Sequence, residues 1–342
     1  MNTYKIAING FGRIGRDFFR LSLESPHAQH LEVVAINDLG DIDNLAYLLK
    51  YDTVYGPLGK EVHVLNREEG TFLQVGEHVI LVCSEKDPHN LPWKQLDIDV
   101  VVESTGFFTS SEASQAHIDA GAKRVVISAP TKDETVMATP GLGMEHLPDT
   151  QISSNASCTT NATNPVAAIL HERLGIKKAM LSTVHAYTST QSLVDGMAKK
   201  DVRRGRAAAE NIIPSTTGAA KAVAKVIPEL EDVFDGVAIR VPVAAGSLID
   251  MTMLVEQNTS VQEVNTFLQE GADSHQWAGI LKVTKDPIVS SDILGNRFGS
   301  IVSLDLTQVV DGDMVKVMAW YDNEWSYTSM LMKHVEASCE CI

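Results

Sequence analysis

The sequence predicts an α/β protein: a Rossmann-type doubly wound parallel sheet plus a second α+β catalytic domain with a mixed or antiparallel sheet. In the first half of the 342-residue chain, short apolar runs typical of strands alternate with runs typical of helices. A glycine-rich turn follows the first strand-like run. After residue 155 the strand-like runs become longer. Alternating strands and helices imply parallel pairing through right-handed crossovers, and the later pattern implies a separate sheet.

The individual elements follow from periodicity and from turn residues. In the first half we expect strands over 4–8, 31–36, 99–102 and 124–127, and helices over 13–25 and 111–120. In the second half we expect helices over 164–174 and 325–336, and strands over 179–184, 237–241, 249–255 and 314–320. The first domain therefore covers 1–156 and is joined by a C-terminal helix at about 324–342. The second domain covers 157–323.

Charge and composition exclude several classes of protein. The formal net charge is −16, which argues against a nucleic-acid surface. No apolar run approaches the roughly 20 residues of a membrane span, and no signal-peptide pattern opens the chain. Cys83, Cys158, Cys339 and Cys341 are spaced like neither a disulfide framework nor a zinc site. We expect a soluble, cytoplasmic protein without a metal, whose last residues form an exposed tail.

The glycine-rich turn has the context of a dinucleotide site. Gly10, Gly12 and Gly15 form G-x-G-x-x-G between a strand and a helix, where a tight turn and the helix N-terminus can receive a pyrophosphate. Asp38 ends the second strand, where a carboxylate accepts hydrogen bonds from a ribose and repels a 2′-phosphate. NAD is therefore expected rather than NADP, although Asp38 could instead be a turn or N-cap residue. Thr105 and Ser128 end two further strands at the same edge of the sheet.

Cys158 is the candidate nucleophile. It stands between small hydroxyl residues just before a helix-like run, and a helix N-terminus lowers the pKa of a thiol. His185, at the end of the strand over 179–184, is the candidate general base. The alternative is that Cys158 is a small buried residue and His185 a core histidine.

Two arginines, hydroxyl groups and a glycine follow His185, and such groups suit phosphate oxygens. They are Thr188, Arg204, Thr217, Gly218 and Arg240. A phosphorylated substrate is implied. Taken alone, the basic run over 203–206 is better explained as a solvated loop.

Six ordered motifs make the chain resemble the phosphorylating glyceraldehyde-3-phosphate dehydrogenase family over essentially its whole length. They occupy residues 8–16, 154–161, 185–188, 214–221, 240–242 and 320–325. The resemblance implies NAD-dependent oxidation of glyceraldehyde 3-phosphate with inorganic phosphate, through a thioester on Cys158, with His185 as acid and base. It also implies a homotetramer, in which the segment at about 187–213 crosses between subunits near the cofactor.

The resemblance assigns further roles. Thr188 and Arg240 would bind the substrate phosphate. The incoming inorganic phosphate would be surrounded by Ser157, Thr159, Arg204, Thr217 and Gly218. The cofactor contacts would be Gly10, Gly12, Arg13, Ile14, Gly15, Asp38, Lys86, Thr105, Ser128, Asn323 and Tyr327.

Some positions depart from the family pattern. Ala162 replaces a common second cysteine, and Lys86 stands where an arginine near the adenine is usual. The segment over 131–141 does not align with the family's usual residues. An erythrose-4-phosphate dehydrogenase remains the alternative enzyme. A binding or adhesion role would be secondary to catalysis.

Overall fold

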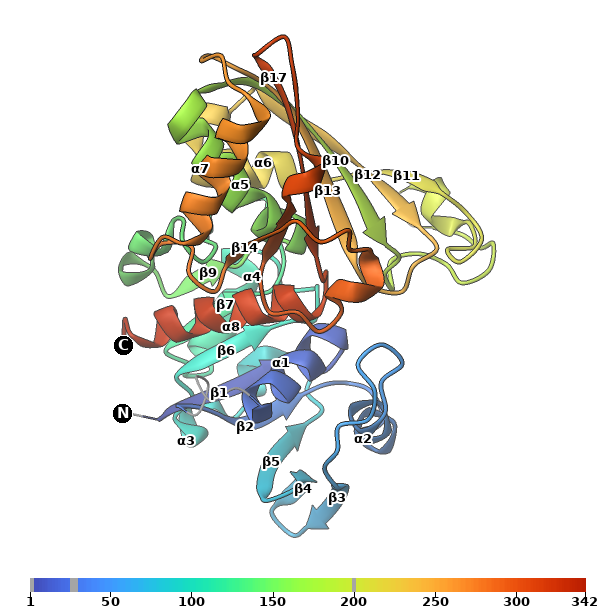
Figure 1. Ribbon diagram of the computed structural model, residues 1–342. Helices are drawn as coiled ribbons and strands as arrows, with labels where there is room; N and C mark the ends of the chain where they lie inside the picture. The colour runs from blue at the N-terminus through green and yellow to red at the C-terminus, as the bar shows by residue number, and fades with distance from the viewer. Residues whose placement is uncertain (1–2, 25–29, 199–200) are drawn as a thin grey trace. The chain divides into compact units, whose positions relative to one another are not determined.

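The computed structural model describes residues 3–24, 30–198 and 201–342. These residues separate into two compact units (Figure 1). Unit 1 contains the residues up to 138 together with 143–156 and 331–342, and unit 2 contains 139–142 and 157–330.

Unit 1 is built on a sheet whose described strands follow the order β3-β4-β5-β2-β1-β6-β7-β9-β8. The strands are β1 Tyr4–Asn9, β2 Leu31–Asn37, β3 Val62–Arg67, β4 Gly70–Val75, β5 His78–Cys83, β6 Val100–Glu103, β7 Arg124–Ile127, β8 Val136–Met137 and β9 Ile152–Ser154. The pairs on the path from β5 through β2, β1, β6, β7 and β9 to β8 are parallel. The described helices are α1 Arg13–Glu24, α2 Ile42–Lys50, α3 Trp93–Leu96, α4 Ser111–Asp119 and the C-terminal part of α8 Trp325–Cys339. The predicted Rossmann-type parallel sheet is confirmed.

Five described strands of this sheet, β3, β4, β5, β8 and β9, were not expected from the sequence. β3, β4 and β5 form an antiparallel meander at one edge. Each is six residues long and mostly half-exposed, so its apolar pattern is weak. Such short, half-exposed strands are stabilised by pairing with their neighbours, which periodicity does not show.

Unit 2 contains a second, mixed sheet with the strand order β11-β12-β10-β13-β17-β15-β14 and β16 paired to β17. The strands are β10 Ile176–Ala186, β11 Ile213–Thr216, β12 Phe234–Val241, β13 Ser247–Val255, β14 Leu281–Thr284, β15 Ser300–Ser303, β16 Gln308–Val310 and β17 Met314–Tyr321. β10 pairs with β12 in parallel and with β13 antiparallel. The predicted mixed or antiparallel sheet is confirmed.

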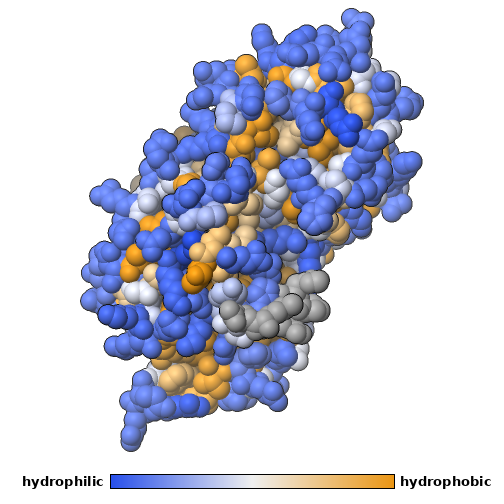
Figure 2. Space-filling view, turned by 90° about the vertical axis from the view of Figure 1, so that its left-hand side faces the viewer, coloured by the Kyte–Doolittle hydropathy of each residue, from blue (hydrophilic) through white to orange (hydrophobic). Residues whose placement is uncertain are grey.

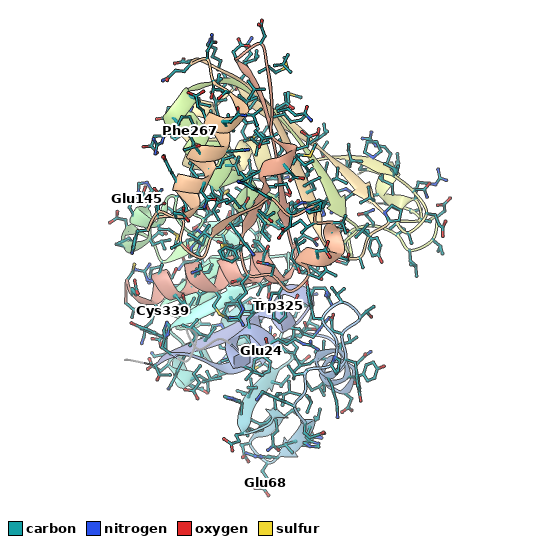
Figure 3. The ribbon with its side chains drawn as sticks, viewed as in Figure 1. Glu24, Glu68, Glu145, Phe267, Trp325 and Cys339 are labelled. Atoms are coloured by element: carbon teal, nitrogen blue, oxygen red, sulfur yellow. The ribbon has the colours of Figure 1, made fainter. Side chains whose placement is uncertain are left out.

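Helices cover one face of this second sheet. They are α5 Cys158–Leu174, α6 Ala219–Val226 and α7 Val261–Ala272, which lie together in Figure 1. Val166 and Leu170 of α5 are fully buried among Leu181, Met251 and Val317 of the strands. Phe267 projects from α7 (Figure 3), where the guanidinium carbon of Arg173 lies 5.3 Å from its ring centre. This core fixes the N-terminus of α5, at which Cys158 lies.

The C-terminal residues do not form an exposed tail. Cys339 lies at the end of α8 (Figure 3) and is 1% exposed. The Arg124 guanidinium donates to the carbonyl of Cys341 at 2.9 Å and also to the carbonyls of Leu147 and Thr150. The hydrogen bond between Arg124 and Cys341 joins residues 217 positions apart, so no local sequence pattern predicts it.

The Asp133 carboxylate holds the first part of the segment over 131–141, which does not align with the family's usual residues. Asp133 accepts a hydrogen bond from the backbone of Ser111 at the start of α4, and another from the Thr135 hydroxyl. β8 then pairs in parallel with β9.

On the face shown in Figure 2, hydrophilic side chains cover most of the surface and apolar ones show between them. No helix within the described ranges is long and apolar enough to cross a membrane.

Candidate active site

The glycine-rich turn of unit 1 borders a pocket of about 410 Å³. Gly10 has a φ of +93° and Gly15 packs against it, because a Cβ on Gly15 would lie 2.2 Å from the Gly10 carbonyl oxygen. Among the described residues, apart from Gly12 and its two chain neighbours, no atom lies within 4 Å of the place where a Cβ on Gly12 would stand. The turn is therefore tight behind Gly10 and open at Gly12, as close approach of a pyrophosphate requires.

Asp38 joins the turn to the end of β2. One carboxylate oxygen accepts from the backbone of Phe11 at 2.6 Å, and the other from the backbone of Gly40 at 2.8 Å. Asp38, Lys86 and Thr105 line the same pocket as Gly10 and Gly12.

Six of the expected cofactor residues lie outside the pocket lining that the described residues form: Arg13, Ile14, Gly15, Ser128, Asn323 and Tyr327. Arg13 makes an ion pair with Asp52, and its guanidinium lies 5.5 Å from the centre of the Tyr55 ring. Ile14 lies in the first turn of α1. Ser128 follows β7 and donates its backbone N–H to the carbonyl of Glu103.

In unit 2, Cys158 is the first residue of α5. Ser157 caps this helix, and its hydroxyl accepts from the backbone of Thr160 at 3.1 Å. Sγ of Cys158 lies 3.4 Å from Nε2 of His185, the next-to-last residue of β10. The structure therefore brings the two candidate catalytic residues together.

The protonation of this pair differs from the sequence expectation of a lowered thiol pKa. Burial raises the pKa of the Cys158 thiol, although the charge of Arg240, the Thr159 hydroxyl and the backbone N–H groups of Thr159 and Cys158 all act to lower it. The helix N-terminus thus acts as expected, but desolvation of the thiolate outweighs it. Burial, together with the charge of Arg240, lowers the pKa of His185 to about 3. Both directions favour a neutral thiol beside a neutral imidazole over a thiolate and imidazolium pair.

Nδ1 of His185 has two neighbours. It lies 2.7 Å from the carbonyl oxygen of Ala186 and 2.7 Å from Nη1 of Arg240. Arg240 also donates to the Ala186 carbonyl at 3.0 Å. The two contacts favour opposite tautomers, because Arg240 can only donate to Nδ1 whereas the Ala186 carbonyl can only accept from it. The tautomer with its proton on Nδ1 is the one that leaves Nε2 free to take the proton of Cys158.

Arg204 forms a second cationic group in unit 2. Its guanidinium donates to the Ser215 hydroxyl at 2.8 Å and to the Thr190 hydroxyl at 3.4 Å. The Thr190 hydroxyl lies 2.9 Å from that of Thr188. Thr190 and Ser215 were not predicted as site residues, although the Thr-x-Thr spacing at 188–190 was a signal for Thr190.

The remaining phosphate candidates lie at two helix N-termini. The hydroxyl of Thr217 accepts from the backbone of Ala219, and Gly218 precedes α6. Thr159 lies in the first turn of α5, and its hydroxyl is 2.9 Å from that of Tyr321. Tyr321 is fully buried, was not expected from the sequence, and also contacts the Thr183 hydroxyl at 2.7 Å.

The amide of Asn323 is oriented by its neighbours. Its oxygen accepts from the backbone of Gly246 at 3.1 Å and from the hydroxyl of Ser247 at 2.9 Å, so its NH₂ group is directed elsewhere. Ser247 in turn accepts from the backbone of Ala186. Tyr327 is buried in the first turn of α8.

A parallel sheet with a glycine-rich nucleotide turn, joined to a mixed sheet with a cysteine and histidine in contact, defines the class of two-domain dehydrogenases. The model of the glyceraldehyde 3-phosphate dehydrogenase NAD binding domain matches residues 4–111, and that of the C-terminal domain matches residues 157–323. The chain belongs to the glyceraldehyde-3-phosphate dehydrogenase family.

Curated relatives match over almost their full length. The chain is 46% identical over 332 residues to the glyceraldehyde-3-phosphate dehydrogenase of Streptomyces coelicolor, covering 96% of this chain and 97% of that protein. It is 47% identical to that of Geobacillus stearothermophilus, with 95% of each chain covered, and 47% identical to that of Clostridium pasteurianum, with 97% of each covered.

Proposed function

We propose that this chain oxidises glyceraldehyde 3-phosphate to 1,3-bisphosphoglycerate with NAD and inorganic phosphate. The observation that carries this proposal is the contact of Cys158 with His185, with Arg240 on the other side of the imidazole ring. We assign the NAD-binding domain to residues 1–156 together with the helix near 324–342. We assign the catalytic domain to residues 157–323.

The pocket of unit 1 fits the adenosine part of NAD. An open approach at Gly12 suits a pyrophosphate, and the Asp38 carboxylate suits a ribose diol. When bound, NAD supplies the hydride acceptor. Asn323, whose NH₂ group is left to donate, would hold the carboxamide of the nicotinamide.

The chain's own residues carry the covalent steps. Sγ of Cys158 adds to the aldehyde carbon while its proton passes to Nε2 of His185, which then protonates the new oxyanion to give a hemithioacetal. His185 removes the hydroxyl proton as the carbon is oxidised to a thioester. An oxygen of inorganic phosphate displaces the thiolate, and the imidazolium returns its proton to Sγ.

The cationic groups supply binding and electrostatics. Arg240 and Thr188 would hold the phosphate of the substrate, and Arg204, Thr159, Thr217 and Gly218 would hold the incoming phosphate, with Ser157 capping the helix that carries Cys158. An anion bound to Arg240 offsets the positive charge that lowers the pKa of His185. Substrate would therefore make His185 a stronger base.

The deciding experiment is NAD reduction by the purified protein with glyceraldehyde 3-phosphate, with and without inorganic phosphate. We expect multiple turnovers with phosphate and a single-turnover burst without it. Erythrose 4-phosphate and NADP are the comparison reactants, and faster turnover with erythrose 4-phosphate would assign the alternative substrate. The Cys158→Ala variant should show no turnover but should bind NAD with the affinity of the wild type. Turnover by Cys158→Ala would exclude the thioester route.

We also propose a cytoplasmic homotetramer. Large apolar side chains stand exposed around the segment at about 187–213: Leu193 at 80%, Met197 at 102%, Val202 at 82% and Ile212 at 71%. Such a cluster is typical of an interface between subunits. Sedimentation equilibrium tests the assembly, and a monomer at micromolar concentration would refute it.

A further inference from the structure

A fully buried carboxylate lies behind the wall of the unit 1 pocket. Glu103 ends β6 beside Asn9 at the end of β1, and neither its side chain nor that of His117 is exposed. Glu103 is not among the residues that line the pocket. The expected catalytic chemistry does not use it, so its burial calls for another explanation.

Four donors satisfy this carboxylate. One oxygen accepts from the backbone N–H and from the hydroxyl of Thr105. The other accepts from Nδ2 of Asn9 at 2.5 Å and from Nε2 of His117 at 3.2 Å. A carboxylate with four donors in a buried site fixes all of them in one arrangement.

Trp93 fixes the orientation of His117, one of these four donors. Its indole N–H lies 3.0 Å from Nδ1 of His117. An indole nitrogen can only donate, so Nδ1 of His117 must accept and the ring proton must lie on Nε2, facing Glu103. His117 can therefore donate to Glu103 without carrying a charge.

The same network reaches three parts of the pocket wall. The Thr105 hydroxyl accepts from the backbone of Phe107, which orders the turn after β6. The oxygen of Asn9 accepts from Nδ2 of Asn37 at 2.7 Å. Asn37 in turn holds the backbone of Glu85 through both amide atoms. Asn9, Asn37, Glu85, Thr105 and Phe107 all line the pocket.

We propose that Glu103 is a positioning residue for cofactor binding, which sets the pocket wall by orienting Thr105 and Asn9 and is itself oriented by His117 and Trp93. This inference rests on the proposal that the pocket receives the adenosine half of NAD. In Glu103→Gln, the new NH₂ group must face either the two donors of Thr105 or those of Asn9 and His117. In the first orientation the backbone N–H of Thr105 loses its acceptor, and in the second Asn9 and His117 both lose theirs.

The test is calorimetric titration with ADP-ribose, which carries the adenosine half alone. We expect Glu103→Gln to raise the Kd about tenfold, and Trp93→Phe, which releases His117 without touching the carboxylate, to raise it about threefold. In steady state, the KM for NAD should rise by the same factors, while the KM for glyceraldehyde 3-phosphate stays at the wild-type value.

Asp99→Asn is the matched control. Asp99 is also buried, and its carboxylate accepts from the backbone of Lys5 and from Nζ of Lys123, before β6 and away from the pocket lining. This variant should unfold at a lower temperature yet bind ADP-ribose as the wild type does. Equal Kd values for Glu103→Gln, Trp93→Phe and Asp99→Asn would overturn the inference. If Glu103→Gln does not fold, the inference is tested by comparing the Kd for ADP-ribose of Trp93→Phe with that of Asp99→Asn. A wild type that binds NAD but not ADP-ribose would remove the pocket assignment itself, and the inference with it.

Discussion

Nη1 of Arg240 lies 2.7 Å from Nδ1 of His185, on the ring edge opposite the one that faces Cys158. A positive charge at this position disfavours an imidazolium, and it lowers the pKa of both His185 and the Cys158 thiol. Arg240 thus influences the protonation of both members of the proposed catalytic pair. The position of Arg240 beside the imidazole therefore accounts for both its predicted binding of phosphate and its effect on the protonation of His185.

Removal of this charge should shift the pH dependence of Cys158 reactivity. In Arg240→Met the pKa values of both His185 and Cys158 rise, because the charge that lowers them is absent. The midpoint of alkylation by iodoacetamide, an uncharged reagent, should therefore move to higher pH. Arg204→Met is the comparison, since Arg204 makes the smallest contribution to the pKa of His185 and should cause a smaller shift. An unchanged midpoint in Arg240→Met would contradict this electrostatic account.

Stability in mild acid should depend on His334. Its Nδ1 lies 3.1 Å from the carbonyl oxygen of Ala138 and its Nε2 lies 2.8 Å from the Ser153 hydroxyl, so the neutral ring is satisfied. Burial lowers its pKa to about 4. Between this value and the ordinary histidine pKa of about 6.5, the unfolded chain binds a proton that the folded chain does not. Stability is therefore lost as the pH falls through this window.

His334→Asn should reduce that loss. The slope of unfolding free energy against pH should fall by at most about 1.4 kcal/mol per pH unit, the contribution of one proton. Urea unfolding from pH 7 to pH 4 measures the slope separately from the offset that the substitution causes at neutral pH. Parallel curves for the variant and the wild type would show that His334 does not bind a proton differently in the two states.

The parts of the site that the sequence predicts are those that depend on local structure. Gly10 and Gly15 must meet in a tight turn, Asp38 must end a strand, and Cys158 must start a helix, and all of these can be read from neighbouring residues. The pairing of Cys158 with His185 was predicted because a nucleophile needs a base, His185 ends a predicted strand, and the family resemblance gives the two residues these roles. The 3.4 Å contact itself depends on how α5 packs against β10.

Other features depend on contacts between distant positions. Tyr321 meets Thr159 and Thr183 across 162 and 138 residues, and Arg124 reaches the C-terminal backbone across 217. The raised pKa of Cys158 also depends on burial, which packing alone determines. A helix N-terminus is visible in the sequence, but the solvent that surrounds it is not.

Tyr321→Phe should destabilise unit 2. The phenol hydroxyl contacts the Thr159 and Thr183 hydroxyls, and all three side chains are buried. Its removal leaves two hydroxyl groups with one partner fewer, at a cost of about 1–3 kcal/mol in unfolding free energy. Denaturant unfolding measures the loss. Because Thr159 is also a proposed phosphate ligand, the KM for inorganic phosphate should rise in the same variant, and an unchanged KM would separate Thr159 from that role.

Ser247→Ala should weaken the use of NAD through Asn323. The Ser247 hydroxyl donates to the Asn323 oxygen and accepts from the backbone of Ala186, so it fixes which end of the amide faces a ligand. Without it, Gly246 remains as the one described donor to that oxygen, and the amide can rotate. We expect the KM for NAD to rise about tenfold, and Ser247→Thr, which keeps a hydroxyl, to recover most of the loss.

Ser326→Ala provides the matched control for this substitution. The Ser326 hydroxyl is equally buried and donates to the carbonyl of Asp322, in the turn that carries Asn323. Its removal loses one buried hydrogen bond and leaves both donors to the Asn323 oxygen in place. Steady-state kinetics should therefore give a KM for NAD near the wild-type value in Ser326→Ala and a raised one in Ser247→Ala. Equal values in the two variants would mean that the Asn323 amide keeps its orientation without the serine, and that the Gly246 backbone alone is sufficient to hold it.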